Sequence, residues 1–245
     1  MSEPIITVRD LTIGWGETIL MQNVTFDVPE RDIFVILGGS GCGKSTLLRN
    51  MIGLEVPMKG KVAIRGVDKV GADQPPPFGV LFQSGALFGS MTVGDNVALP
   101  LRRWTEYDDD TIDVLVRAKL ALVGLSGFEN HLPSEISGGM KKRAGIARAL
   151  ALDPPLLFLD EPGAGLDPIS SVELDSLIKT LNESLGVTAV IVTHELASIF
   201  AIAKHCIMLE REAKGVIAEG DPRELRDHST DPRVSRFLNR RSEES

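Results

Sequence analysis

The feature that most constrains this chain is a glycine-rich run, GGSGCGKST, which begins at Gly38 and ends at Thr46. It follows the apolar run 33–37 and matches the pattern G-x-x-x-x-G-K-[ST] of a phosphate-binding loop (Walker A). Glycine lets backbone N–H groups turn toward a polyphosphate with no Cβ in the way, and a helix start behind them is electropositive. The run therefore predicts a nucleotide site made by Gly38, Gly39, Ser40, Gly41, Cys42, Gly43, Lys44, Ser45 and Thr46.

Two side chains of this loop are assigned chemical roles. Lys44 supplies a point charge for the β- and γ-phosphates, and Ser45 offers a hydroxyl to Mg²⁺, which prefers oxygen ligands. The alternative is a glycine-rich loop that only caps a helix. The strand-like run before the loop and the helix-like run 47–52 after it favour the nucleotide site.

Composition narrows the class of protein. The 245 residues are 43% hydrophobic and 24% charged, which is typical of a globular protein with a buried core. The net charge of −8 argues against nucleic acid as a partner. Cys42 and Cys206 form neither a metal-ligand nor a disulfide pattern, which favours a reducing, cytosolic compartment. We find no signal peptide and no apolar run of about 18–20 residues, so we expect any membrane role to be peripheral.

Hydrophobic periodicity predicts an α/β fold with a parallel sheet. From Met91 to about Leu152 the pattern is helical, and another helix is expected from Ile169 to Leu185. The tail from Asp231 is either a docking segment or disordered. Strand-like runs lie within 5–28, 61–66, 79–83, 154–162, 188–195 and 204–210.

Polar residues end several of these apolar strands. Gln83 ends one, Asp160 and Glu161 end the next, and His194 ends a third. Gln83 alone could be a strand-end cap and His194 a structural histidine, but in an open parallel sheet the carboxyl ends of the strands bind the ligand. We therefore expect all four beside the phosphate loop. Asp160 then holds Mg²⁺ through water, Glu161 is the general base, Gln83 senses metal and water, and His194 contacts the γ-phosphate or orients the base.

Three further features have both a structural and a functional interpretation. Ser137 can cap a helix that Gly138 and Gly139 open with exposed N–H groups, which suits an anion or an ordinary capped helix. Asp167 can cap the helix that follows it. Trp15, in a Gly-Trp-Gly break, either packs in a turn or offers a flat face to a purine.

Taken together, GGSGCGKST, Gln83, ISGGM, LLFLDEP, AGLD and His194 resemble the nucleotide-binding subunit of an ATP-binding cassette (ABC) transporter over nearly the whole chain. The resemblance implies a P-loop NTPase (RecA-like) core with an N-terminal antiparallel β-subdomain and a helical subdomain inserted at about 91–153. This ABC ATPase domain would cover 1–230, followed by a tail at 231–245.

The resemblance also implies ATP and Mg²⁺ as cofactors and a head-to-tail homodimer that sandwiches two ATP. In that dimer Ser137, Gly138 and Gly139 bind the γ-phosphate of ATP held by the opposite subunit. Asp167 matches the D-loop, which also acts in trans, and Trp15 the adenine-stacking aromatic. The metal ligands would be Ser45, Gln83 and Asp160.

Two positions depart from the family pattern. Met140 stands where the signature usually ends in Gln, so only backbone contacts to nucleotide are expected there, and Trp15 stands where Tyr is commoner. The variants ISGGMKKRAGIARAL and DPRVSRFL resemble the ATPase of Mla-type lipid transporters, which work with a mammalian-cell-entry (MCE) domain protein and an integral membrane permease.

That subfamily implies phospholipid transport, small accessory subunits and a place on the cytoplasmic face of the inner membrane, held by the permease. The segment after Gln83, with Leu87, Phe88 and Met91, either receives a permease helix or packs in the core. An ABC importer or exporter for another solute remains an alternative. A soluble ABC ATPase acting on DNA or ribosomes would carry a long coiled coil or a second cassette, and a phosphate-loop kinase would give ISGG no role.

Overall fold

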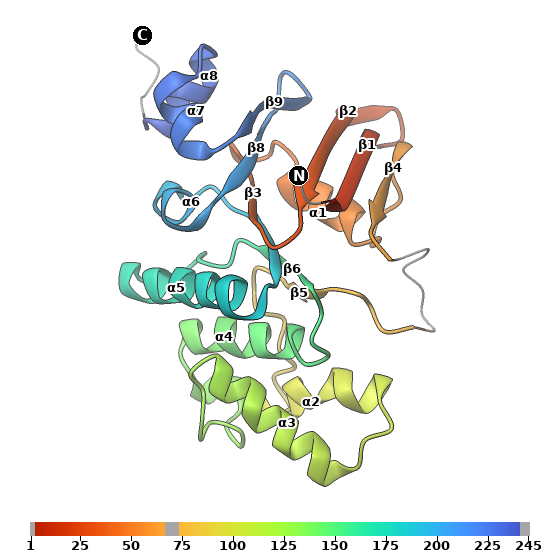
Figure 1. Ribbon diagram of the computed structural model, residues 1–245, viewed down its shortest axis with the longest axis vertical. Coiled ribbons are helices and arrows are strands. Elements are labelled where there is room, and N and C mark those ends of the chain that lie inside the picture. The colour runs from red at the N-terminus through yellow and green to blue at the C-terminus, as the bar shows by residue number, and fades with distance from the viewer. Residues whose placement is uncertain (1–2, 67–73, 241–245) are drawn as a thin grey trace. The chain divides into compact units, whose positions relative to one another are not determined.

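The computed structural model describes residues 3–66 and 74–240, which form two compact units (Figure 1). Unit 1 contains residues 3–66 and 188–240, and unit 2 contains residues 74–187. The two ends of the chain therefore build one unit together, and the middle of the chain builds the other.

Unit 1 begins with an antiparallel sheet of three strands, in the order β2-β1-β4. Strands β1 and β2 form a hairpin that turns at Gly16, whose φ of 56° suits glycine. One face of β1 is fully buried, with Ile6, Val8 and Leu11 at 0% exposure. The N-terminal antiparallel subdomain is as predicted. The bounds are β1 Pro4–Trp15, β2 Thr18–Pro29 and β4 Lys59–Ile64.

The other sheet of unit 1 has β3 between β7 and β8, parallel to both. Every residue of β3 and β7 is buried, as expected for strands covered on both faces. Strand β9, which was not predicted from the sequence, pairs antiparallel with β8. The bounds are β3 Ile33–Gly38, β7 Thr188–Val192, β8 His205–Glu210 and β9 Gly215–Gly220.

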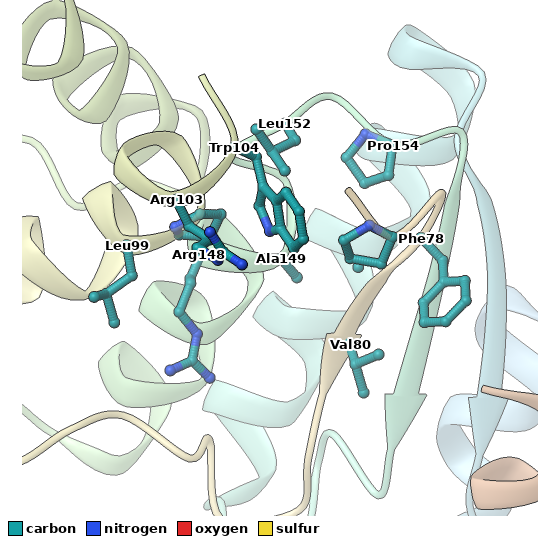
Figure 2. A pocket seen from close by; sticks show the side chains of 12 residues that line it. Phe78, Val80, Leu99, Arg103, Trp104, Arg148, Ala149, Leu152 and Pro154 are labelled. Carbon is teal, nitrogen blue, oxygen red and sulfur yellow. The ribbon is translucent and has the colours of Figure 1, made fainter. Parts of the chain in front are cut away.

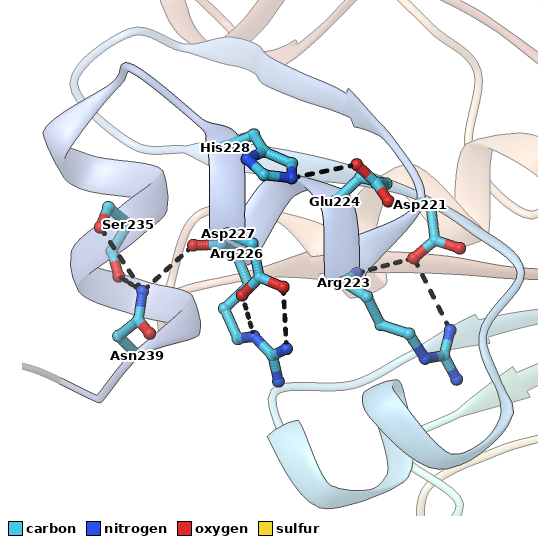
Figure 3. A network of polar contacts seen from close by, with 8 residues as sticks. All are labelled: Asp221, Arg223, Glu224, Arg226, Asp227, His228, Ser235 and Asn239. Atoms are coloured by element: carbon cyan, nitrogen blue, oxygen red, sulfur yellow. Dashed lines mark hydrogen bonds and ion pairs between the residues drawn. The ribbon is translucent and has the colours of Figure 1, made fainter.

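Four helices complete the described part of unit 1, namely α1 Lys44–Met51, α6 Leu196–Ile202, α7 Pro222–His228 and α8 Pro232–Leu238. Helices α7 and α8 both begin with Asp-Pro, in which the aspartate caps the helix and proline occupies its first position. Figure 3 shows Asn239, at the end of α8, on the side that faces α7, and its Nδ2 donates to the carbonyl of Arg226 at 3.4 Å. Val234 and Leu238 are buried. The tail is thus a packed helix over these residues, and 241–245 lie outside the described residues.

Unit 2 contains two parallel strands, β5 Gly79–Leu81 and β6 Leu156–Asp160. Its helices are α2 Val93–Trp104, α3 Asp109–Leu122, α4 Gly138–Ala149 and α5 Pro168–Leu185, with a short 3₁₀ helix at Pro133–Glu135. Each of the four α-helices starts at a side-chain N-cap: Thr92, Asp108, Ser137 and Asp167. Helices α2 to α4 lie within the range predicted for the helical subdomain.

The core of unit 2 joins these helices to its strands. Phe158 of β6 is fully buried and meets Phe78 edge to face, with ring centroids 5.2 Å apart. Gly79 packs so closely on α4 that an added Cβ would lie 2.2 Å from the carbonyl oxygen of Ala149. This close approach sets β5 directly against α4, which matters for the site.

Candidate nucleotide site

The phosphate loop of unit 1 has a shape that requires glycine. Gly38, Gly41 and Gly43 have φ values of 150°, 74° and 98°. A Cβ on Gly38 would lie 2.4 Å from the carbonyl oxygen of Leu209, and one on Gly43 would lie 2.4 Å from Cε of Met21. The positive φ favours glycine at all three positions, and at Gly38 a backbone oxygen also leaves no room for a side chain.

Lys44 is buried at 8% exposure and reaches back over the loop. Its Nζ donates to the carbonyl of Gly38 at 2.9 Å and to that of Gly39 at 3.1 Å. Gly43, the N-cap of α1, brings no side-chain acceptor, and the first turn of this fully described helix has no acidic residue. The N–H groups of the helix start and the ammonium together make an electropositive site that fits a polyphosphate.

Two cysteines lie near this part of the sheet and are free thiols. Cys42 of the loop is 3% exposed, and burial raises the pKa of its thiol. Cys206 of β8 is fully buried, which raises its pKa to about 12. Both thiols are therefore neutral at physiological pH and act as small apolar side chains.

His194 leaves the sheet beside the phosphate loop. In the parallel register of β3 and β7, Ile36 is the partner of Val192. Gly38 and His194 each come two residues further on, so both lie at the carboxyl edge of this sheet. The structure thus places His194 and the loop at the same edge of the sheet within unit 1, and a contact of His194 with the γ-phosphate stays a prediction.

Trp15 occupies the end of β1 and is 57% exposed. It belongs to the same hairpin as Leu20 and Met21, whose side chains lie against the Cα of Gly43. The exposed indole on a hairpin that packs on the phosphate loop is consistent with adenine stacking, which stays a prediction.

In unit 2, Gln83 and Glu161 lie close together. Leu81 of β5 pairs with Leu159 of β6, so the two residues follow their strands at the same edge. One ammonium, that of Lys142 on α4, donates to the backbone carbonyls of both. From the sequence, the KKR run that contains Lys142 suggests a basic cluster at the helix start, facing either an anion or solvent. The structure instead buries Lys142 at 5% exposure and directs its ammonium to these two carbonyls.

The two adjacent carboxylates at the end of β6 are buried. Asp160 is 7% exposed and Glu161 is 8% exposed. Glu161 has a φ of 46°, a left-handed conformation that is rare for a residue with a side chain and that recurs at functional sites. Two buried carboxylates side by side repel each other, and a cation between them and a phosphate would relieve that repulsion.

The structure also brings Asp167 and the glycines of α4 together. A Cβ on Gly138 would lie 3.7 Å from Leu166, and one on Gly139 would lie 3.5 Å from Cβ of Ser170. Asp167 Oδ1 accepts from the backbone N–H groups of Ile169 and Ser170, each at 3.0 Å. The Ser170 hydroxyl, together with these amides, lowers the pKa of Asp167, so its carboxylate is ionised at neutral pH.

The predicted metal ligands divide between the units, with Ser45 in unit 1 and Gln83 and Asp160 in unit 2. Over residues 3–66 and 74–240, no three His, Cys, Asp or Glu residues cluster as a metal site. That donor set fits Mg²⁺, which takes one or two protein oxygens and fills its shell with phosphate and water.

A family model described as "ABC transporter" matches residues 21–164. A probable ribonucleotide transport ATP-binding protein of Mycobacterium leprae is 43% identical over 96% of this chain and 69% of the relative. An intermembrane phospholipid transport system ATP-binding protein of Haemophilus influenzae is 40% identical over 97% of this chain and 91% of the relative. This chain belongs to the ABC transporter family.

A solved structure agrees with the family. The dimeric, post-hydrolysis state of the ATP-binding cassette MJ0796, bound to ADP and Pi, aligns with a TM-score of 0.77 at 30% identity. The alignment covers 88% of this chain and 98% of that one. The P-loop NTPase fold and the ATPase activity predicted from the motifs are thereby confirmed, as is the resemblance to the Mla-type ATPases.

Within the described ranges, no helix of this ABC ATPase is both long enough and apolar enough to cross a bilayer.

Proposed function

We propose that this chain is the ATP-hydrolysing subunit of a phospholipid transporter of the Mla type, and that it dimerises on ATP to drive a membrane permease. One observation carries the proposed mechanism. The β5–β6 register places the buried Glu161 beside Gln83, directly after Asp160. This is the arrangement that a general base, a water-positioning amide and a metal-binding carboxylate require.

The residues of one subunit have distinct roles in this proposal. Lys44 and the loop amides bind the β- and γ-phosphates, and Glu161 accepts a proton from the attacking water. Gln83 orients that water, and His194 donates to the γ-phosphate. Bound Mg²⁺, held by Ser45, Gln83 and Asp160, would neutralise charge that develops on the phosphates.

The second half of each site comes from another copy of the chain. Ser137, Gly138 and Gly139 present a capped helix start, with Asp167 next to them, and ATP held by the partner would sit against it. Ile169 and Val172, just beyond Asp167 on α5, are 73% and 64% exposed. Such apolar residues next to an anion-binding helix start suit an interface between two copies.

A cavity in unit 2 fits a permease segment. Its volume is about 480 Å³, and Figure 2 shows Phe78, Val80, Leu99 and Trp104 around it. Leu87, Phe88 and Met91, which the sequence pointed to, do not line this cavity. The guanidinium groups of Arg103 and Arg148 at an otherwise apolar cavity suit a short apolar helix with acidic residues at its end.

The proposed cargo is phospholipid. The Haemophilus influenzae relative, named for intermembrane phospholipid transport, is matched over 91% of its length, and the Mycobacterium leprae relative, named for ribonucleotide transport, over 69%. The complex purified from its native membrane through a tag on this chain would contain a permease and an MCE-domain protein. The ATPase rate of the complex should rise with phospholipid vesicles. Stimulation by free ribonucleotides instead would contradict the proposal that phospholipid is the cargo.

Replacement of Glu161 by Gln tests the catalytic proposal. Because the amide cannot accept the proton, we expect kcat for ATP hydrolysis to fall by about 10²-fold or more while ATP still binds. Light scattering after gel filtration should show an ATP-bound dimer of the variant, since hydrolysis no longer separates the copies. Glu183→Gln, an isosteric change on exposed α5, is the matched control and should hydrolyse ATP normally.

A Glu161→Gln variant with wild-type turnover would remove the general-base role. If the variant loses turnover but two copies fail to associate with ATP, in the assembled complex as well, the proposed ATP-dependent dimer is contradicted.

A further inference from the structure

One side of helix α4 binds the backbone of residues 83–86, the segment that follows β5. Lys142 is 5% exposed, and its Nζ donates to the carbonyl of Gln83 and, at 3.3 Å, to that of Glu161. Six residues further on, Arg148 donates to the carbonyl of Ala86 at 2.7 Å and to that of Gly85 at 3.2 Å. One helix thus binds the backbone of 83–86 through two cationic side chains.

Between these cations, α4 packs closely against the segment at Gly145. A Cβ on Gly145 would lie 2.6 Å from Cδ1 of Leu81 and 3.2 Å from the carbonyl oxygen of Gly85. Lys142, Gly145 and Arg148 are spaced three residues apart and so share one side of the helix. The helix and the segment are therefore in direct contact over this stretch.

The segment is folded so that its carbonyl groups meet these donors. Gly85 donates its N–H to the carbonyl of Phe82 at 2.8 Å and closes a turn after the strand. Gly85 and Ala86 have φ values of 76° and 48°. For Ala86 this conformation is uncommon, and the guanidinium of Arg148 stabilises it by binding the carbonyl that it presents.

The other carbonyl bound by Lys142 belongs to a residue in an equally uncommon conformation. Glu161 has a φ of 46°, and its carbonyl also accepts from the N–H of Ala164 at 3.1 Å. A left-handed backbone at a residue with a side chain persists only where its surroundings hold it. Lys142 is one of the groups that hold it, and the orientation of the Glu161 carboxylate depends on that backbone.

We propose that Lys142 is a positioning residue that ties the start of α4 to the backbones of Gln83 and Glu161. It lies in the second turn of the helix that Ser137 caps. A shift of the helix start, when it closes on a phosphate, is therefore transmitted to the general base and to the water-positioning amide of the same subunit. The inference rests on the roles proposed for Gln83 and Glu161.

Lysine suits this task because its ammonium has three donors on a long stem and can serve two carbonyl groups at once. Methionine has a similar length and fills the space, but it cannot donate. Arginine keeps several donors. Lys142→Met therefore removes the hydrogen bonds to the Gln83 and Glu161 carbonyls, and Lys142→Arg is the conservative variant that should restore them.

The matched control is Lys119→Met. Lys119 is also a buried lysine of unit 2, at 8% exposure, but its ammonium binds Asp153. This variant removes a buried ammonium of the same kind without touching Gln83 or Glu161. Any loss that follows only from destabilising unit 2 should appear in both methionine variants.

The experiment compares these variants as full-length proteins in ATP turnover, nucleotide binding, melting temperature and hydrogen exchange. For Lys142→Met we expect kcat to fall by on the order of 10- to 100-fold, because small displacements of catalytic groups have effects of that size. KM for ATP should stay within about twofold, because the phosphate loop is unchanged. Exchange of the amides in a peptide covering 82–88 should become faster, and Lys142→Arg should restore both readouts.

In Lys119→Met, kcat should be unchanged, and the amides of 82–88 should exchange as slowly as in the wild type, whatever the melting temperature of the variant. An unchanged kcat or unchanged exchange in Lys142→Met would overturn the inference, as would an equal loss of kcat in Lys119→Met at an equal melting temperature. Glu161→Gln run alongside separates the two proposals. If Glu161→Gln is inactive while Lys142→Met has normal turnover, only the positioning role of Lys142 is contradicted. If Glu161→Gln is active, the general-base role of Glu161 is contradicted.

Discussion

Lys44 shows how one side chain can be used by both the loop and its ligand. Its ammonium binds the carbonyl groups of Gly38 and Gly39 at 2.9 and 3.1 Å and is nearly buried. The loop therefore carries its own cation at the place where phosphate oxygens would meet the amide groups. Because hydrogen bonds to charged groups are stronger than neutral ones, this residue should dominate nucleotide affinity.

Lys44→Ala tests that dependence. We expect ATP to bind about 10- to 100-fold more weakly, which is the loss of one or two charge-assisted hydrogen bonds. Isothermal titration calorimetry on the variant would measure it, with Lys61→Ala, an exposed lysine of β4, as the control for a lost positive charge. Equal affinity in Lys44→Ala and the wild type would mean that the backbone amides alone bind the phosphates.

At the scale of elements, α4 combines three tasks along its length. Its capped start lies beside Asp167 and is proposed to bind the partner's ATP. Its middle holds Gln83 and Glu161 through Lys142. Its last turn, with Arg148 and Ala149, lines the cavity proposed for the permease. A single rigid helix can therefore connect nucleotide, catalytic residues and permease.

Ser137→Asp separates the structural task of this helix start from its binding task. Ser137 Oγ accepts from the N–H of Met140 at 3.2 Å, and aspartate is an equally good N-cap. We expect the free energy of unfolding to change by less than about 0.5 kcal/mol, while ATP-dependent dimerisation is lost because a carboxylate would face the γ-phosphate. Urea unfolding and light scattering measure the two effects.

Two further variants complete that test. Ser137→Asn keeps the cap without the charge and should dimerise better than Ser137→Asp, and Ser134→Asp adds the same charge on the nearby 3₁₀ helix and should dimerise normally. Normal dimerisation of Ser137→Asp would show that the helix start does not meet the partner's nucleotide.

At the scale of the whole molecule, both units supply residues that the proposal needs. Unit 1 holds the phosphate loop and His194, and unit 2 holds Gln83, Glu161 and the start of α4. Nucleotide that contacts both units of one chain and α4 of another would stabilise all of them through mass action.

The measurable consequence is a melting temperature that depends on nucleotide, metal and protein concentration. In Glu161→Gln, Mg-ATP at about 100 times its dissociation constant should stabilise the protein by roughly 2.7 kcal/mol, and more as protein concentration rises, because the folded dimer is favoured. Scanning fluorimetry would show this, and removal of Mg²⁺ with EDTA should reduce the shift. Lys44→Ala should show little shift, and a shift independent of protein concentration would argue against the dimer.

Apart from the antiparallel pairing of the N-terminal strands, which the family resemblance implied, the sequence by itself determined the phosphate loop, the N-terminal and buried strands and the residues at their ends. These follow from local rules, since the glycine pattern, the apolar runs and the N-caps each act within a few residues. The described structure decided what those rules leave open. It added β9 and α8, whose placement depends on β8 and α7, and it revealed a cavity lined by Phe78, Leu99 and Trp104 that the sequence did not indicate. Above all it showed Lys142 bridging Gln83 and Glu161, because contacts between residues 59 and 19 positions apart are set by the packing of α4 and not by the neighbours of Lys142 in sequence.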